Sequence, residues 1–171
     1  QNSGMTEEEI VDEYGADAMR FDLASSVTEA RDIDLDRRKF EEFKNFSNKL
    51  WNGSRFILMY LFPEEGTPFV DCIKSFHITD ILLEDSWILS RLHKAQTLIK
   101  KHLLEYQFDK ASYIAYSFFW DEFCAWWIEC SKPALSGKEG LEKEKNKKAL
   151  AALLLFETLQ LLHPFIPFIT E

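Results

Sequence analysis

The chain has 171 residues, of which 46% are apolar, and this is enough for one ordinary domain with a hydrophobic core. An aromatic content of 15% excludes a disordered chain. Six glycines and five prolines leave few turns, which favours a few long helices over a sandwich or barrel. The net charge of −9 excludes uniform attraction to nucleic acid or to an anionic membrane. The longest apolar run, residues 149–156, is too short to cross a bilayer, so we expect no membrane partner.

The charge is unevenly distributed along the chain. Residues 1–36 carry eleven acidic and two basic side chains, whereas residues 37–60 carry six basic and two acidic ones. Because salt screens distant charges, the basic segment can still attract RNA locally. Three cysteines, Cys72, Cys124 and Cys130, form no CxxC pair and no metal-ligand spacing. We expect reduced, buried thiols in a cytoplasmic protein, and no secretory leader pattern opens the sequence.

The first helices are predicted from capping signals and apolar spacing. Residues 6–9 read Thr-Glu-Glu-Glu, a capping box, and the helix that they start should end at Gly15. A second short helix is predicted over 16–24, followed by a polar connection over 25–35. Asp36 should cap a long helix that ends at about Leu61. Its inward stripe consists of Phe43, Phe46, Leu50, Ile57, Leu58 and Leu61.

The remaining elements follow in order. Residues 62–79 contain two prolines and a glycine and are predicted to be irregular. A second long helix should run from 79 or 80 to 106. A third, capped by Asp109, should end before Pro133; its six aromatics within residues 118–127 predict a central helix that is apolar on most sides. A charged linker and helix start over 134–148 should lead into a leucine-rich helix over 148–163. Residues 170–171 resemble a new cap, as expected of a chain truncated at its C-terminus.

One face of the helix predicted over 36–61 combines hydrogen-bond donors with an aromatic ring. Opposite Phe43, helical spacing gathers Asn45, Asn48, Lys49, Asn52 and Phe56, with Arg55 to one side. Asn and Lys donate to base edges and phosphates, and an aromatic ring offers a stacking surface, so this face is a candidate RNA-binding site. The alternative interpretation is that another helix covers Phe56 and the polar residues are only solvated. Trp120 and Glu122 are candidates for the rim of a groove. The sequence contains no glycine-rich phosphate loop, GxSxG or HExxH motif, so we expect neither a catalytic centre nor a metal site.

Several segments resemble one enzyme family. Residues 14–21, YGADAMRF, resemble the YGADALRF segment of class I aminoacyl-tRNA synthetases. Residues 45–56, NFSNKLWNGSRF, resemble the NFxNKLWNxxRF helix of valyl-tRNA synthetases. Residues 31–33, 87–92, 119–127, 132–133 and 163–171 continue the resemblance in the same order over nearly the whole chain. Isoleucyl and leucyl synthetases share the first segment but usually differ in the others.

The resemblance implies an all-α fold with two parts: the end of a stem-contact segment over 1–35, and an anticodon-binding helical bundle over 36–171. It implies recognition of the anticodon of a valine-accepting tRNA by a monomeric enzyme. In full length that enzyme attaches valine to tRNA with ATP and magnesium, using catalytic and editing domains absent here. This part should need no cofactor.

The resemblance also implies roles for individual residues. Lys49, Arg55 and Phe56 match family positions that face the anticodon loop, and Arg38 lies on the preceding start of the helix. Asn45 and Asn52 extend the set along the same stripe. Two alternatives remain: the anticodon-binding domain of an isoleucyl or leucyl synthetase, and a helical protein–protein docking module whose stripe binds a partner helix.

Overall fold

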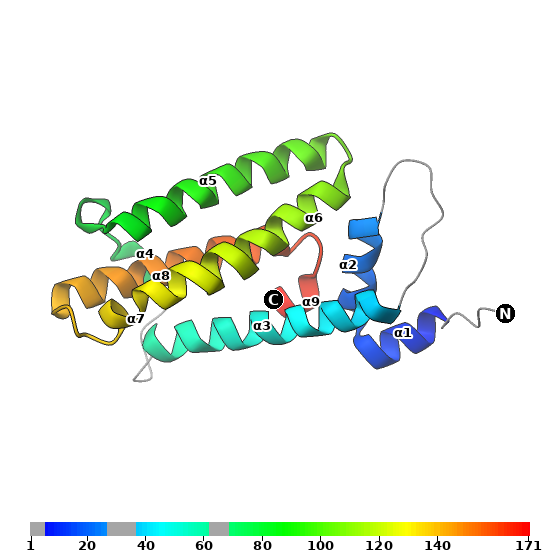
Figure 1. Ribbon diagram of the computed structural model, residues 1–171, viewed down its shortest axis with the longest axis horizontal. Coiled ribbons are helices and arrows are strands. Elements are labelled where there is room, and N and C mark those ends of the chain that lie inside the picture. Colours follow the sequence, from blue (N-terminus) through cyan, green and yellow to red (C-terminus); the bar gives the residue numbers. More distant parts are fainter. Residues whose placement is uncertain (1–5, 27–36, 62–68) are drawn as a thin grey trace.

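The computed structural model describes residues 6–26, 37–61 and 69–171, and within these ranges it contains helices and no strand (Figure 1). The order of elements is α1 (Glu7–Tyr14), α2 (Ala16–Ser26), α3 (Arg37–Leu61), α4 (Phe69–Lys74), the 3₁₀ helix η1 (Ile78–Asp80), α5 (Leu83–Leu104), α6 (Phe108–Ser117), the π-helix η2 (Phe118–Ile128), α7 (Glu129–Leu135), α8 (Leu141–Leu162) and α9 (Pro167–Thr170). The predicted all-α bundle is confirmed.

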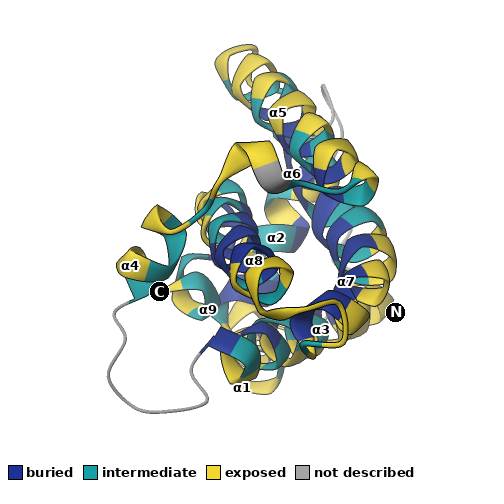
Figure 2. Ribbon diagram, turned by 90° about the vertical axis from the view of Figure 1, so that its left-hand side faces the viewer, coloured by how far each residue is buried: buried dark blue, intermediate teal, exposed yellow. Residues whose placement is uncertain are grey.

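Four long bodies form the bundle. These are α3, α5, α8 and the continuous rod made of α6, η2 and α7, while α1 and α2 lie at the end where α3 begins (Figure 1). Helix α8 is buried on most of its surface (Figure 2), and it carries the apolar residues Leu150, Leu154, Leu155 and Leu162 into the core. A helix that is apolar nearly all round is stable only when other helices surround it.

Helix α1 begins and ends as its sequence signals predict. Thr6 caps α1: the Glu9 N–H donates to the Thr6 hydroxyl (3.3 Å), and the Thr6 N–H donates to the Glu9 carboxylate (2.8 Å). The chain turns at Gly15, whose φ of 88° is unfavourable for a residue with a side chain. Helix α2 then extends to Ser26, two residues beyond the prediction.

Several predicted boundaries were wrong. Helix α5 starts at Leu83 rather than at 79 or 80, because η1 and an extended Ile81 precede it. Helix α8 starts at Leu141 rather than at Lys148, within the segment predicted as linker and helix start. The described part of the predicted irregular segment contains α4 and η1. The predicted cap Asp36 and residues 27–35 and 62–68 lie outside the described residues.

The α6–η2–α7 rod departs most from its prediction. It begins at Phe108 after a left-handed Tyr106 (φ 57°), so Asp109 lies in the first turn instead of capping the helix. It also runs through Pro133 to Leu135. Proline removes one helical hydrogen bond, but Ala134 and Leu135 are buried beyond it, and their packing holds the last turn in place.

Burial also corrects three predictions about side chains. The aromatic segment is core on only one side: Phe118, Phe119, Phe123 and Trp127 are buried, whereas Trp126 is 65% exposed. Leu58, predicted to face inward on α3, is exposed. The thiols are free, but none is fully buried: Cys72 and Cys124 are partly buried and Cys130 is exposed.

A buried charge network joins three elements of the core. The Lys147 ammonium on α8 donates to the carboxylates of Asp85 (2.6 Å) and Glu84 (2.9 Å) at the start of α5. Asp85 also accepts hydrogen bonds from the Trp127 indole N–H (2.9 Å) and from the Leu82 N–H (3.0 Å). Lys147 and Asp85 are each only 3% exposed, so the partners compensate for charges that are removed from water.

A second set of contacts ties α2 to the end of the chain. The Asp17 carboxylate accepts hydrogen bonds from the N–H groups of Phe168 (3.3 Å) and Ile169 (2.8 Å) in the short helix α9. The Arg20 guanidinium donates to the Pro164 carbonyl (3.2 Å). The YGAD segment therefore contacts the HPFIPF segment, about 150 residues later in the chain.

The buried network yields a stability prediction. We expect Lys147→Met to lower the free energy of unfolding by about 3–5 kcal/mol, because Asp85 keeps a buried charge without its ammonium partner. Urea denaturation measures the change. Lys145→Met is the matched control on the same helix, since its pair with Glu142 (3.6 Å) is exposed. Equal stability of the two variants would contradict the structural role of Lys147.

Candidate nucleic-acid interface

One side of α3 meets the α6–η2–α7 rod along a line that we call the α3 seam. On α3 it comprises Asn45, Lys49, Gly53 and Phe56, and on the rod it comprises Tyr116, Trp120, Cys124 and Lys132. The helices approach closely at Gly53, where an added Cβ would lie 3.3 Å from the Cys124 sulfur. Glycine here permits this approach, so the seam residues on either side face each other.

Lys49 is held in the seam by an aromatic stack. Its ammonium lies 3.8 Å from the centre of the Trp120 ring. Trp120 in turn stacks on Tyr116, with ring centres 5.7 Å apart and planes 10° apart. The quadrupole of an indole ring attracts a cation that lies over its face. The Lys49 ammonium is therefore held in one position on Trp120 instead of sampling many side-chain conformations. A positioned ammonium loses less conformational entropy when it binds a phosphate.

Phe56 lies at the other end of the seam and is half-buried. Its ring packs edge-on against Tyr60 at 5.0 Å, and the Lys132 ammonium lies 5.7 Å from its centre. The sequence allowed two interpretations, a Phe56 ring exposed for stacking on RNA and a Phe56 ring covered by another helix. The structure lies between them, because the ring is partly buried.

The other predicted residues of α3 lie on its solvent face. Arg38, Asn48, Asn52 and Arg55 are exposed, and so is Asn45 at the edge of the seam. For the three asparagines, the helical spacing opposite Phe43 predicts this exposure. Their donors are arranged along one side of a single helix, beside the seam.

The two rim candidates do not share one groove. Trp120 faces α3 through Lys49, whereas Glu122 faces α5. The Glu122 carboxylate accepts hydrogen bonds from both the Nε (2.6 Å) and the Nη2 (2.5 Å) of Arg91. This bidentate pair raises the pKa of the Arg91 guanidinium and occupies the Glu122 oxygens.

An exposed apolar group on α3 was not predicted from the sequence. Trp51 and Met59 are 64% and 66% exposed, and with Arg55 and Leu58 they border a shallow hollow of about 360 Å³. Trp51 precedes Arg55 by one helical turn, and this spacing was the available signal.

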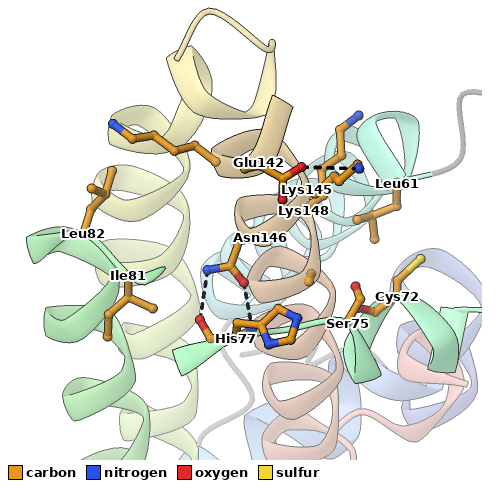
Figure 3. A pocket seen from close by; sticks show the side chains of 12 residues that line it. Leu61, Cys72, Ser75, His77, Ile81, Leu82, Glu142, Lys145, Asn146 and Lys148 are labelled. Carbon is orange, nitrogen blue, oxygen red and sulfur yellow. Dashed lines mark hydrogen bonds and ion pairs between the residues drawn. The ribbon is translucent and has the colours of Figure 1, made fainter. Parts of the chain in front are cut away.

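A separate cavity of about 570 Å³ lies between α4, η1 and the start of α8 (Figure 3). The Asn146 amide accepts a hydrogen bond from the His77 N–H (2.8 Å) and donates one to the His77 carbonyl (3.0 Å). The lysines around it lie beside carboxylates of the same helix: Lys145 is 3.6 Å from Glu142, and Lys148 is 2.6 Å from Glu144. These pairs neutralise the local field, so the cavity is a poor phosphate site.

Among the described residues, no three His, Cys, Asp or Glu side chains are grouped so as to hold a metal ion. The same part of the chain contains no helix that is both long and apolar enough to cross a membrane.

A family model described as the anticodon-binding domain of tRNA ligase matches residues 85–171, which extend from α5 to the end of the chain. The chain therefore belongs to this family of anticodon-binding domains.

The similar relatives are named valine–tRNA ligases. The enzyme of Protochlamydia amoebophila is 48% identical over 169 residues, which cover 95% of this chain and 18% of that enzyme. The enzyme of Thermotoga maritima is 41% identical, covering 99% of this chain and 18% of the enzyme. The enzyme of Chlamydia muridarum is 43% identical, covering 95% and 17% respectively. The chain thus spans about 18% of the length of the first two relatives, and these alignments extend over α3 as well as over the family match.

Partial burial of Phe56 makes its substitution distinguishable from that of a core phenylalanine. Phe46 is fully buried, so Phe46→Ala should cost about 3–5 kcal/mol of stability. Phe56→Ala should cost clearly less, because part of its ring already contacts water. Thermal unfolding of both variants measures the difference. Equal destabilisation would assign Phe56 to the core.

The three thiols should differ in reactivity. Burial raises the pKa of the Cys124 thiol to about 12, although nearby Lys49 lowers it slightly. At pH 8 this group stays protonated and unreactive, while Cys130 is open to solvent. Brief alkylation with iodoacetamide followed by peptide mass spectrometry should label Cys130 and spare Cys124. Comparable labelling of both would show that the seam opens at Gly53.

Proposed function

We propose that this chain is the anticodon-binding part of a longer valine–tRNA ligase and binds the anticodon arm of valine-accepting tRNA. The observation that carries this proposal is the Lys49 ammonium held on Trp120 beside a row of exposed donors, in a member of the anticodon-binding family. We propose valine as the amino acid of the tRNA because the relatives are named valine–tRNA ligases.

Each residue of the interface has a role in this proposal. Lys49, Arg55 and Arg38 contact phosphates or base edges, because cations dominate affinity for RNA. Phe56 offers the exposed part of its ring for stacking. The amides of Asn45 and Asn52 pair with base edges.

The remaining parts of the proposal concern the whole enzyme. Residues 1–35 would contact the tRNA stem and residues 36–171 would form the bundle; the Asp17 contacts with α9 support a fixed attachment of the two. ATP, magnesium and valine would bind in the catalytic domain of the same chain, and an editing domain would complete the enzyme. We expect a cytoplasmic monomer.

A second candidate function is supported by one observation. Exposed Trp51 and Met59 on α3 favour a protein-docking face. Ionic strength separates the two functions, because phosphate contacts weaken steeply with salt whereas apolar docking responds little.

The test is a titration of this chain with a hairpin RNA of the valine anticodon arm at several salt concentrations. We expect Lys49→Met to weaken binding and to reduce the salt slope by about one unit if Lys49 contacts a phosphate. Lys100→Met is the control, because Lys100 is exposed on α5, away from the seam.

Two comparisons complete the test. Arms with isoleucine or leucine anticodons should bind more weakly than the valine arm. Salt-independent binding, or equal effects of the Lys49 and Lys100 variants, would contradict the assigned interface.

A further inference from the structure

A shallow hollow of about 420 Å³ lies where the start of α5 meets the end of η2 and the start of α7. We call it the indole hollow, and it is lined by Leu83, Glu84, Trp87, Trp126, Trp127 and Cys130. Its size is typical of ligand pockets, which measure roughly 300–1,000 Å³. Among the described residues, none of α3 borders it. The α3 seam and the proposed RNA interface therefore do not account for this aromatic surface.

The surface of the indole hollow is aromatic and largely open to solvent. Leu83, Trp87 and Trp126 are exposed. Trp127 is fully buried, and its indole N–H donates to the Asp85 carboxylate (2.9 Å), which fixes that ring beside the other two. Among aromatic rings, the face of tryptophan attracts a cation most strongly. The rings therefore favour a ligand that combines a positive charge with an apolar stem.

The charged side chain that lines the indole hollow is a carboxylate. Glu84 is partly exposed, and its Oε1 accepts a hydrogen bond from the Lys147 ammonium (2.9 Å). Lys147 also pairs with Asp85 (2.6 Å), so one ammonium is shared between two carboxylates. One negative charge of this group of three remains uncompensated. Glu84 is its exposed member, so this charge faces the hollow and attracts a cation.

The positive groups near the indole hollow are already compensated. Arg91, one turn further along α5, is held by its bidentate pair with Glu122. Lys132 on α7 lies 2.6 Å from the Glu129 carboxylate. The N-terminus of a helix carries a partial positive charge, and at the start of α5 Asp85 accepts a hydrogen bond from a backbone N–H there (3.0 Å). A cation that enters the hollow therefore meets attraction from Glu84 without an unpaired positive side chain beside it.

We propose that the indole hollow binds an arginine side chain presented by a protein partner. A guanidinium is planar and weakly hydrated, so it stacks on an indole face while its fork of N–H donors reaches the Glu84 carboxylate. A lysine ammonium is more strongly hydrated and loses more on leaving water. Leu83 offers an apolar contact to a residue beside the arginine. This docking site is separate from RNA binding and does not depend on the proposed function.

The test uses three short peptides that differ only in a central residue placed between two leucines: arginine, lysine or citrulline. Citrulline has the shape of arginine but no charge. Binding to this chain is followed by NMR through the tryptophan indole N–H signals. We expect the arginine peptide to shift the Trp87 and Trp126 signals saturably and to bind about tenfold more tightly than the citrulline peptide. The lysine peptide should lie between the two.

Two results with the unmodified chain would overturn the proposal. Equal affinities of the arginine and citrulline peptides would show that the hollow attracts apolar groups only. A lysine peptide that binds as tightly as the arginine peptide would remove the selection for a guanidinium. Neither result depends on whether a variant folds.

Matched variants locate the site. Trp126→Leu should weaken binding of the arginine peptide about tenfold. Trp51→Leu removes an equally exposed indole from α3 (64% against 65%) and should leave affinity unchanged. Glu84→Gln should weaken the arginine peptide about fivefold without affecting the citrulline peptide, while Glu142→Gln, at an exposed acid on α8, should affect neither. Thermal unfolding confirms that each variant is folded. Equal effects within either pair of folded variants would overturn the assignment to this hollow.

Discussion

The enclosed ammonium of Lys147 constrains how the helices of this domain can meet. A charge that is only 3% exposed is tolerated when partners replace its water, and here α5 supplies Asp85 and Glu84. Asp85 also binds the Trp127 indole, so the same carboxylate fixes the rotation of η2 about its axis. With Trp127 turned toward α5 and α8, the rotation of η2 also sets the direction of Trp120, whose ring contacts the Lys49 ammonium of α3. The position of Lys49 in the seam therefore depends on an ion pair in the core.

The aromatic segment of η2 serves the core and the surface at once. Phe119 and Phe123 are fully buried, whereas Trp120 borders the seam and Trp126 faces solvent. Gly53 lets α3 reach this segment closely enough for Lys49 to lie over Trp120. Rigid core packing thus extends directly into the proposed RNA interface, which reduces the entropy that binding must overcome.

Helical periodicity predicted the fold class and the solvent face of α3, because burial of Phe46, Leu50 and Ile57 follows from spacing within one helix. Helical periodicity failed where burial or a helix boundary depends on contacts with another helix. Leu58 is at the edge of the apolar stripe, and among the described residues no helix covers it fully. Pro133 lies inside a helix because residues beyond it pack in the core. The cavity of about 550 Å³ between α2, α3 and α6 could not be predicted either, since its walls come from three segments, 21–26, 39–46 and 109–120, and the last is far from the others in sequence.

Basic side chains are distributed along the whole of α3. Arg37, Arg38 and Lys39 lie in its first turn, and Lys44, Lys49 and Arg55 follow, with Glu41 and Glu42 as the only acidic residues of the helix. The negative net charge of the chain comes instead from residues 1–36, which carry eleven acidic and two basic side chains. Because salt screens charges beyond about 10 Å, phosphates beside α3 would meet a local excess of positive charge. An acidic chain can therefore still offer a local site for a polyanion, as the proposed function requires.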